Sequence, residues 1–308
     1  MSYALLFPGQ GSQAVGMLGA HAAPVIDATL REASEVLGWD LAGLVRNGPV
    51  EELNRTDRTQ PALLAASVAL WRLWQSQNLP APAALAGHSL GEYSALVAAG
   101  SLGFSDALRL VELRGQLMQA AVPAGTGGMT AIVGLDDEAV ARLCAECPDG
   151  VLEPANFNAP GQVVVAGEIG ALDWLDANGK ASGARMVKRL AMSVPSHCSL
   201  MRGAAQMLAA ALEKIDIVPP SIRVLHNLDA APRADAAGIR AALAAQLHQP
   251  VRWTQTVQAL QATGIARLFE CGPGKVLVGL NKRIAEGLTS VALEDPAGLS
   301  QAAATLNA

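Results

Sequence analysis

The sequence has few aromatic and few charged residues. Over 308 residues, aromatic side chains make up 4% and charged side chains 16%, whereas hydrophobic residues reach 51%. Alanine, leucine and valine must therefore fill most of a sizeable core. The net charge of −5 argues against nucleic acid as the main partner, because phosphate binding favours a basic surface.

Signals for a leader peptide or a membrane span are also lacking. The N-terminal segment has no basic stretch, and its apolar run ends at Pro8. The segment 116–135 is a long stretch without a charge, but it contains Pro123 and several glycines, which favour a loop and a strand over a membrane helix. We therefore expect a cytoplasmic protein that has no membrane partner.

Cysteine is scarce, with residues at positions 144, 147, 198 and 271 only. Cys144 and Cys147 form a CxxC pair, but the second pair that a zinc site of this spacing requires does not follow. The pair lies in a helical pattern, where cysteine commonly behaves as a small hydrophobic residue. We expect ordinary thiols, no metal and no redox cofactor.

Strand, turn and helix patterns alternate along the chain, which is typical of an α/β protein. The main series has strand patterns at 3–7, 83–86, 223–227 and 267–271, and helical patterns at 62–75, 92–99, 105–121, 199–214, 236–247 and 253–263. A second series has strand patterns at 129–133, 162–166 and 185–190, and helical patterns at 137–147 and 171–182. This second series predicts a small subdomain over 125–191, inserted into a main domain formed by 1–124 and 192–308.

The segment GHSLG at 87–91 fits the pattern G-x-S-x-G of a nucleophile elbow. In an elbow, a strand runs into a sharp turn that exposes the serine, and a helix follows. The amide N–H of Leu90 would then lie at the helix start and point at a developing oxyanion. The alternative is a glycine-flanked turn whose serine only caps the helix. Ser89 is thus the candidate nucleophile.

A serine hydroxyl needs a base that takes its proton, and the histidines are the candidates. His88 adjoins the serine, so we expect its side chain to point elsewhere. His197 lies in a loop, VPSHC, where the chain re-enters the main domain, and such loops commonly carry a catalytic base. Spacing alone leaves His226 and His248 as alternatives. With a histidine base, kcat/KM should rise with pH through a step in the ordinary histidine range.

Two further features have both a chemical and a structural interpretation. Arg114 stands in an apolar helical stretch and needs a carboxylate partner, from the protein or from a substrate. From the residues alone, a structural ion pair is the simpler interpretation. The glycine turn at 8–11 can bring a second backbone N–H to the oxyanion, or it can be a plain strand-to-helix turn.

Taken in order, a set of motifs resembles one family. The motifs are FPGQGSQ at 7–13, TQPALLAASVAL at 59–70, GHSLGEYSAL at 87–96, LRG at 113–115, NFNAPGQVVVAG at 156–167, VPSHC at 194–198 and ECGPGKVL at 270–277. Together they resemble the stand-alone malonyl-CoA:acyl carrier protein transacylases of bacterial fatty-acid synthesis. The likeness extends from Leu6 to about Glu294, almost the whole chain.

The resemblance implies an α/β fold in which an α/β-hydrolase-like large subdomain carries an inserted ferredoxin-like small subdomain. It implies that Ser89 is the nucleophile and His197 the base. It assigns the oxyanion to the backbone amides of Gln10 and Leu90, and the malonyl carboxylate to Arg114. Backbone carbonyls, one of them at Gln246, would orient the histidine in place of an acidic residue.

The implied activity is transfer of malonyl from malonyl-CoA to the phosphopantetheine thiol of acyl carrier protein through a malonyl-serine intermediate. The CoA thioester and the carrier's thiol are substrates, so the resemblance implies no cofactor. A monomer is expected. Three alternatives remain open: the transacylase component of malonate decarboxylase, a serine thioesterase or esterase, and a non-catalytic docking module.

Basic residues gather in two stretches that lack acidic ones, 177–212 and 271–285. A basic rim around the serine would steer an acidic carrier protein and the phosphates of CoA toward the site. We expect this rim to consist of Lys188, Arg189, Lys282 and Arg283. The alternative is that these are scattered, solvated charges on separate faces.

Overall fold

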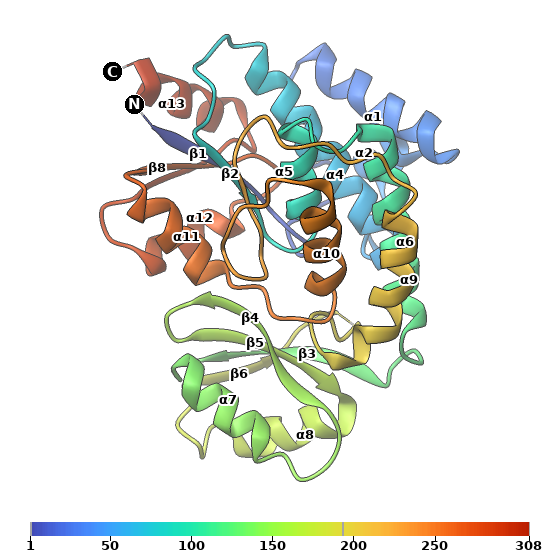
Figure 1. Ribbon diagram of the computed structural model, residues 1–308, viewed down its shortest axis with the longest axis vertical. Coiled ribbons are helices and arrows are strands. Elements are labelled where there is room, and N and C mark those ends of the chain that lie inside the picture. Colours follow the sequence, from blue (N-terminus) through green and yellow to red (C-terminus); the bar gives the residue numbers. More distant parts are fainter. Residues whose placement is uncertain (1, 193, 308) are drawn as a thin grey trace.

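The computed structural model describes residues 2–192 and 194–307. Its larger part is built on a parallel five-stranded sheet with the strand order β7-β2-β1-β8-β9 (Figure 1). The strands are β1 (Tyr3–Phe7), β2 (Ala84–Gly87), β7 (Val224–Leu225), β8 (Arg267–Glu270) and β9 (Thr289–Ala292). Because parallel strands end at the same edge, the turns that follow β1 and β2 meet there.

Helices surround this sheet on both sides. They are α1 (Pro24–Leu37), α2 (Leu41–Asn47), α3 (Val50–Leu53), α4 (Thr56–Gln75), α5 (Gly91–Ala98), α6 (Phe104–Ala120), α9 (Arg202–Leu212), α10 (Ala236–Gln246), α11 (Trp253–Ala262), α12 (Val276–Ile284) and α13 (Pro296–Asn307), with a 3-10 turn at Ser199–Met201. Helix α4 is buried over most of its length between α1 and α6. The main core therefore lies between α4 and the sheet, where Tyr3, Trp74 and Phe269 pack with ring centroids 5.3–5.9 Å apart.

The smaller part is an antiparallel sheet with the strand order β4-β5-β3-β6. Its strands are β3 (Gly127–Val133), β4 (Leu152–Ala159), β5 (Gln162–Glu168) and β6 (Met186–Arg189), and its helices are α7 (Asp137–Ala145) and α8 (Ile169–Asn178). Both helices cover the sheet face that points away from the larger part (Figure 1). All these elements fall within 125–191, the range that we propose for the inserted subdomain.

The small sheet meets the larger part at strand β4, which packs against α11 and α12. The backbone of Val251 accepts a hydrogen bond from Phe157 N at 2.9 Å and donates one to Ala155 O at 2.9 Å. The face of the small sheet opposite its helices contributes Met129, Val164 and neighbouring residues to a cluster with Cys198 from the main domain. This junction brings β3–β6 up to the edge where β1 and β2 end.

Positions 1, 193 and 308, which belong to the proposed main domain, lie outside the described residues. Within the described ranges, no helix combines the length and the apolar character needed to cross a membrane.

Candidate active site

The turn that carries the candidate nucleophile joins β2 to α5. Ser89 has a φ of 51°, in the left-handed region that non-glycine residues rarely adopt. A Cβ at Gly87 would overlap the backbone of Gly91, and a Cβ at Gly91 would overlap the carbonyl of Phe7. Both glycines are therefore required for the close approach of strand, turn and helix, as expected for an elbow.

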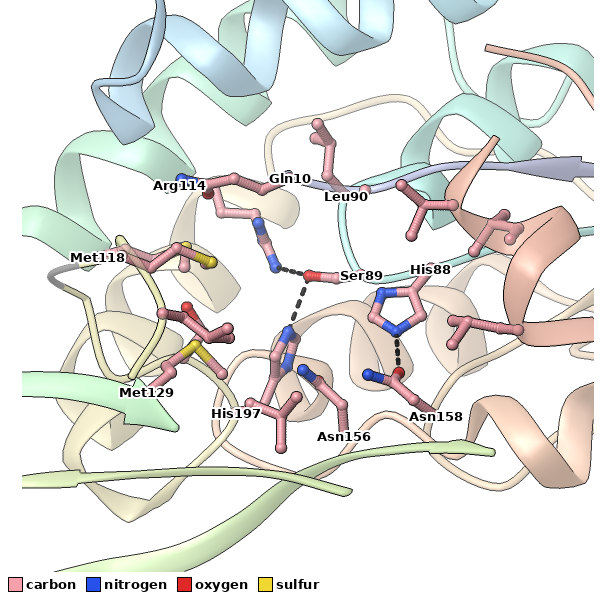
Figure 2. A pocket seen from close by; sticks show the side chains of 18 residues that line it. Gln10, His88, Ser89, Leu90, Arg114, Met118, Met129, Asn156, Asn158 and His197 are labelled. Carbon is pink, nitrogen blue, oxygen red and sulfur yellow. Dashed lines mark hydrogen bonds between the residues drawn. The ribbon is translucent and has the colours of Figure 1, made fainter. Parts of the chain in front are cut away.

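His197 lies directly against this serine. Its Nε2 is 2.8 Å from Ser89 Oγ (Figure 2), and its Nδ1 is 2.7 Å from the backbone oxygen of Gln246. Because a carbonyl only accepts, Nδ1 carries the proton and Nε2 is free to take the serine proton. Among the described residues, His197 is the histidine hydrogen-bonded to Ser89, whereas His226 bonds to Glu92 instead.

The environment keeps His197 neutral. Burial, with a further contribution from the positive charge of Arg114, lowers the pKa of His197 to about 3, although the hydrogen bond to Gln246 O opposes the shift. The step in kcat/KM, expected from the sequence in the ordinary histidine range, should therefore lie well below that range in the free enzyme. The base form is populated throughout the neutral and mildly acidic range.

Arg114 lies on α6 with its guanidinium beside the nucleophile. The side chain donates to Gln60 Oε1 at 2.7 Å, Gln246 Oε1 at 3.0 Å and Ser89 Oγ at 3.2 Å. It is 1% exposed, and burial lowers its pKa below the ordinary value, yet a guanidinium stays protonated. No Asp or Glu in the described part of the chain forms a salt bridge with it. The interpretation of Arg114 as one half of a structural ion pair is thus wrong within the described residues.

A cavity of about 140 Å³ lies beside Ser89 and is lined by residues of both the larger part and the small sheet (Figure 2). Its polar lining includes His88, Asn156 and Asn158, and its apolar lining comes from Met118, Met129, Val164, Leu190, Met192, Val276, Leu277 and Leu280. His88 Nε2 lies 2.8 Å from Asn158 Oδ1. This histidine therefore points away from the serine hydroxyl, as expected, but still lines the same cavity.

The two predicted oxyanion residues also line this cavity. Leu90 immediately precedes α5, and Gln10 follows β1 in the glycine turn. Within the described residues, neither backbone N–H donates a hydrogen bond to a backbone or side-chain acceptor. Both amides are therefore available to donate to a substrate oxygen. Their role stays a prediction.

The CxxC cysteines lie away from the cavity on and after α7. Burial raises the pKa of the Cys144 thiol to about 12, which makes it unreactive at neutral pH. In the ranges that the structure describes, no cluster of His, Cys, Asp or Glu is suited to hold a metal ion.

The four residues of the predicted basic rim differ in their ion pairing, and their place at the entrance stays a prediction. Arg189 donates to Asp173 at 2.9 Å and to Asp176 at 2.6 Å, so two carboxylates balance its charge and it contributes little to a basic rim. Lys188, Lys282 and Arg283 are exposed. Arg283 contacts Gln162 Oε1 on β5, which places the end of α12 against the small sheet.

A serine on a strand-to-helix elbow, a neutral histidine bonded to its hydroxyl and a parallel α/β sheet are typical of serine-nucleophile enzymes. The sequence profile of the family described as "Acyl transferase domain" matches residues 4–292. The chain belongs to this acyl transferase domain family.

Three relatives show how close the similarity is. The malonyl CoA-acyl carrier protein transacylase of Salmonella typhimurium (strain LT2) is 55% identical over 97% of this chain and 98% of its own. A malonyl-transacylase solved in complex with a type II PKS acyl-carrier protein superposes with a TM-score of 0.97 at 52% identity, covering 99% of this chain and 100% of its own. The malonyl CoA-acyl carrier protein transacylase from Coxiella burnetii superposes with a TM-score of 0.98 at 44% identity, covering 100% of this chain and 98% of its own. The predicted family and fold class are confirmed.

Proposed function

We propose that this protein is a malonyl-CoA:acyl carrier protein malonyltransferase of fatty-acid biosynthesis. The observation that carries the proposal is Arg114, a buried cation that lies 3.2 Å from the candidate nucleophile and has no acidic partner among the described residues. A cation so placed favours an acyl group that ends in a carboxylate. The names of the relatives, which cover nearly the whole chain, support the same activity.

In the first half-reaction, Ser89 Oγ attacks the thioester carbonyl carbon of malonyl-CoA while His197 Nε2 takes the hydroxyl proton. The carbonyl oxygen becomes an oxyanion, to which the amides of Gln10 and Leu90 donate. Each such donor lowers the barrier by about 3 kcal/mol. The C–S bond then breaks, the proton passes from His197 to the CoA sulfur, and a malonyl-serine ester remains.

In the second half-reaction, the phosphopantetheine thiol of the carrier protein gives its proton to His197, and its sulfur attacks the ester carbonyl. The same amides hold the oxyanion. When the C–O bond breaks, the proton returns to Ser89 Oγ and malonyl leaves on the carrier. Arg114 holds the free carboxylate through both halves, and Gln246 O keeps the proton on His197 Nδ1. No step of this scheme calls on a cofactor.

The carrier protein approaches, in this proposal, along Lys188, Lys282 and Arg283, because an acidic partner is steered by exposed positive charge. The relative solved with an acyl-carrier protein supports the choice of partner. A monomeric state and a cytoplasmic location remain predictions from the sequence.

The proposal is tested by following malonyl-CoA with the purified protein, with and without phosphopantetheinylated acyl carrier protein. We expect rapid malonylation of the carrier and slow release of free malonate. Malonate release that is independent of the carrier would identify a thioesterase. Transfer only to the carrier subunit of a malonate decarboxylase would identify the transacylase component of that enzyme.

A further inference from the structure

Glu92 is a buried carboxylate three positions after the nucleophile, in the first turn of α5. It is 0% exposed. Among the described residues, His226 lies within ion-pair distance of the Glu92 carboxylate, and no Lys or Arg forms a salt bridge with it. Removing a carboxylate from water is costly unless hydrogen bonds replace the lost hydration. The catalytic scheme above does not use this residue.

The hydrogen bonds of Glu92 come from three donors. Oε1 accepts from His226 Nδ1 at 2.7 Å, and Oε2 accepts from Asn227 N at 2.9 Å and from Gln246 Nε2 at 3.0 Å. An ionised carboxylate can only accept. Glu92 therefore dictates which ring nitrogen of His226 carries a proton and which end of the Gln246 amide faces it.

The orientation of Gln246 decides the geometry on the substrate side. With Nε2 toward Glu92, Nε2 also donates to Ser89 O at 2.9 Å, and Oε1 accepts from Arg114 at 3.0 Å. A flipped amide would place its oxygen against the Glu92 carboxylate and its NH2 group against the guanidinium. Both contacts would be repulsive, so Glu92 is what gives Arg114 its acceptor.

Asn227 connects the same carboxylate to the elbow. Its backbone N–H is held by Glu92, its Oδ1 accepts from Ser89 N at 2.7 Å, and its Nδ2 donates to Gly87 O at 2.6 Å. Ser89 is in the left-handed region, a conformation that persists only where surrounding contacts maintain it. Glu92 thus supports the strained serine through a second route.

We propose that Glu92 is a positioning residue for malonyl transfer, which holds Arg114 through the Gln246 amide and the elbow of Ser89 through Asn227. This inference rests on the proposed function for its acyl specificity. Glu92 touches no reacting atom, so its effect reaches the substrate only through these two neighbours.

The first test replaces the carboxylate by the isosteric amide in Glu92→Gln. One amide oxygen cannot serve all three donors, and a hydrogen bond to a charged group is lost, so malonyl kcat/KM should fall about 10- to 100-fold. Acetyl transfer should fall less, because acetyl does not use Arg114. The matched control is Glu270→Gln: Glu270 is also 0% exposed and accepts from Leu277 N at 3.0 Å and Val278 N at 2.9 Å, with no contact to the serine or its base.

The second test asks whether Glu92 acts through Gln246. In a double-mutant cycle with Gln246→Ala, the malonyl-to-acetyl ratio of the double variant should be close to that of Gln246→Ala alone. Two losses that multiply would overturn the proposed relay. If the malonyl kcat/KM of Glu92→Gln, corrected for the folded fraction, lies within twofold of that of Glu270→Gln, then Glu92 has only a structural role.

Labelling of Ser89 by a fluorophosphonate ester separates this inference from the proposed function. If the wild type transfers no malonyl, the proposed function fails, but slower labelling of Glu92→Gln than of Glu270→Gln still supports the positioning role. Equal labelling rates would overturn it. Should Glu92→Gln not fold, His226→Leu removes one donor and keeps the carboxylate. The same greater loss of malonyl than of acetyl transfer is then expected, and an equal loss contradicts the proposal.

Discussion

Removal of the Arg114 side chain should separate recognition of the acyl charge from the chemistry at Ser89. Arg114→Ala leaves Gln60 Oε1 and Gln246 Oε1 without donors that now lie at 2.7 and 3.0 Å, a loss shared by every acyl substrate. Malonyl alone also brings a carboxylate into the cavity, and a buried charge whose partner is removed costs about 3–5 kcal/mol. At 1.36 kcal/mol per factor of ten, the malonyl-to-acetyl ratio of kcat/KM should fall roughly 150- to 5000-fold.

The assay compares malonyl-CoA and acetyl-CoA as donors to the same carrier protein. Arg114→Lys keeps the charge but loses the planar fork, so it should recover part of the ratio. In the control Arg240→Ala, the lost side chain contacts the carbonyls of Leu212 and Ile215 at 2.9 and 2.7 Å, and the ratio should stay unchanged. Equal falls of both activities in Arg114→Ala would show that the arginine is structural and would refute the reasoning.

Three further predictions follow from the same site. Because the pKa of His197 is lowered to about 3, kcat/KM should show no histidine step between pH 8 and 5. The unfolded chain binds this proton below about pH 6.5 and the folded protein does not. As pH falls below that value, the free energy of unfolding should therefore decrease more steeply in the wild type than in His197→Gln, by at most about 1.4 kcal/mol per pH unit. A step in kcat/KM near pH 6.5 that His197→Gln abolishes would contradict the kinetic prediction. Urea titrations in which the free energy of unfolding changes equally with pH in both proteins would contradict the stability prediction. In Gly91→Ala the added Cβ would overlap Phe7 O, so Tm should fall and labelling of Ser89 should be lost. In Gly203→Ala on α9 the added Cβ meets open space, so neither should change. A Gly91→Ala protein whose Ser89 still reacts would show that the elbow does not require glycine at this position. Reversal of Lys188, Lys282 and Arg283 to Glu should raise KM for the carrier and flatten its salt dependence while malonyl-serine formation changes less, and an unchanged KM would place docking elsewhere.

The local parts of the fold were predictable because their signals lie within a few residues. The apolar runs of β1 and β2, the glycines of the elbow and the helical spacing of α6 all indicate their structures directly. Strand β4 escaped prediction because Pro154 and polar residues interrupt its alternation. Helix α12 was also not predicted, because it is short and follows a glycine-rich turn.

The site was predictable in its parts but not in its assembly. The contact between Ser89 and His197 joins residues 108 positions apart, and that between Arg114 and Gln246 spans 132. No spacing rule connects such segments, so the loop position of His197 favoured it without excluding His226 and His248, and the resemblance decided between them. Asn156 and Asn158 gave no chemical signal before the small sheet placed them in the cavity.

Glu92 shows where sequence reasoning stopped short. It stands at the start of a helix whose other residues are mostly apolar and buried, and a carboxylate in that setting needs buried donors. That signal was present in the sequence. Its donors, however, come from the loop after β7 and from α10, so the network that it organises could be seen only in three dimensions.

The central claim, a malonyl ester on Ser89, is tested most directly by the intact mass of the protein after mixing with malonyl-CoA in the absence of any carrier. The account predicts that the wild type gains one malonyl group, that Ser89→Ala gains none, and that added carrier protein returns the wild type to its original mass. Stoichiometric malonylation of Ser89→Ala, or a wild type that turns over malonyl-CoA without a covalent adduct when it is rapidly quenched, would contradict the account.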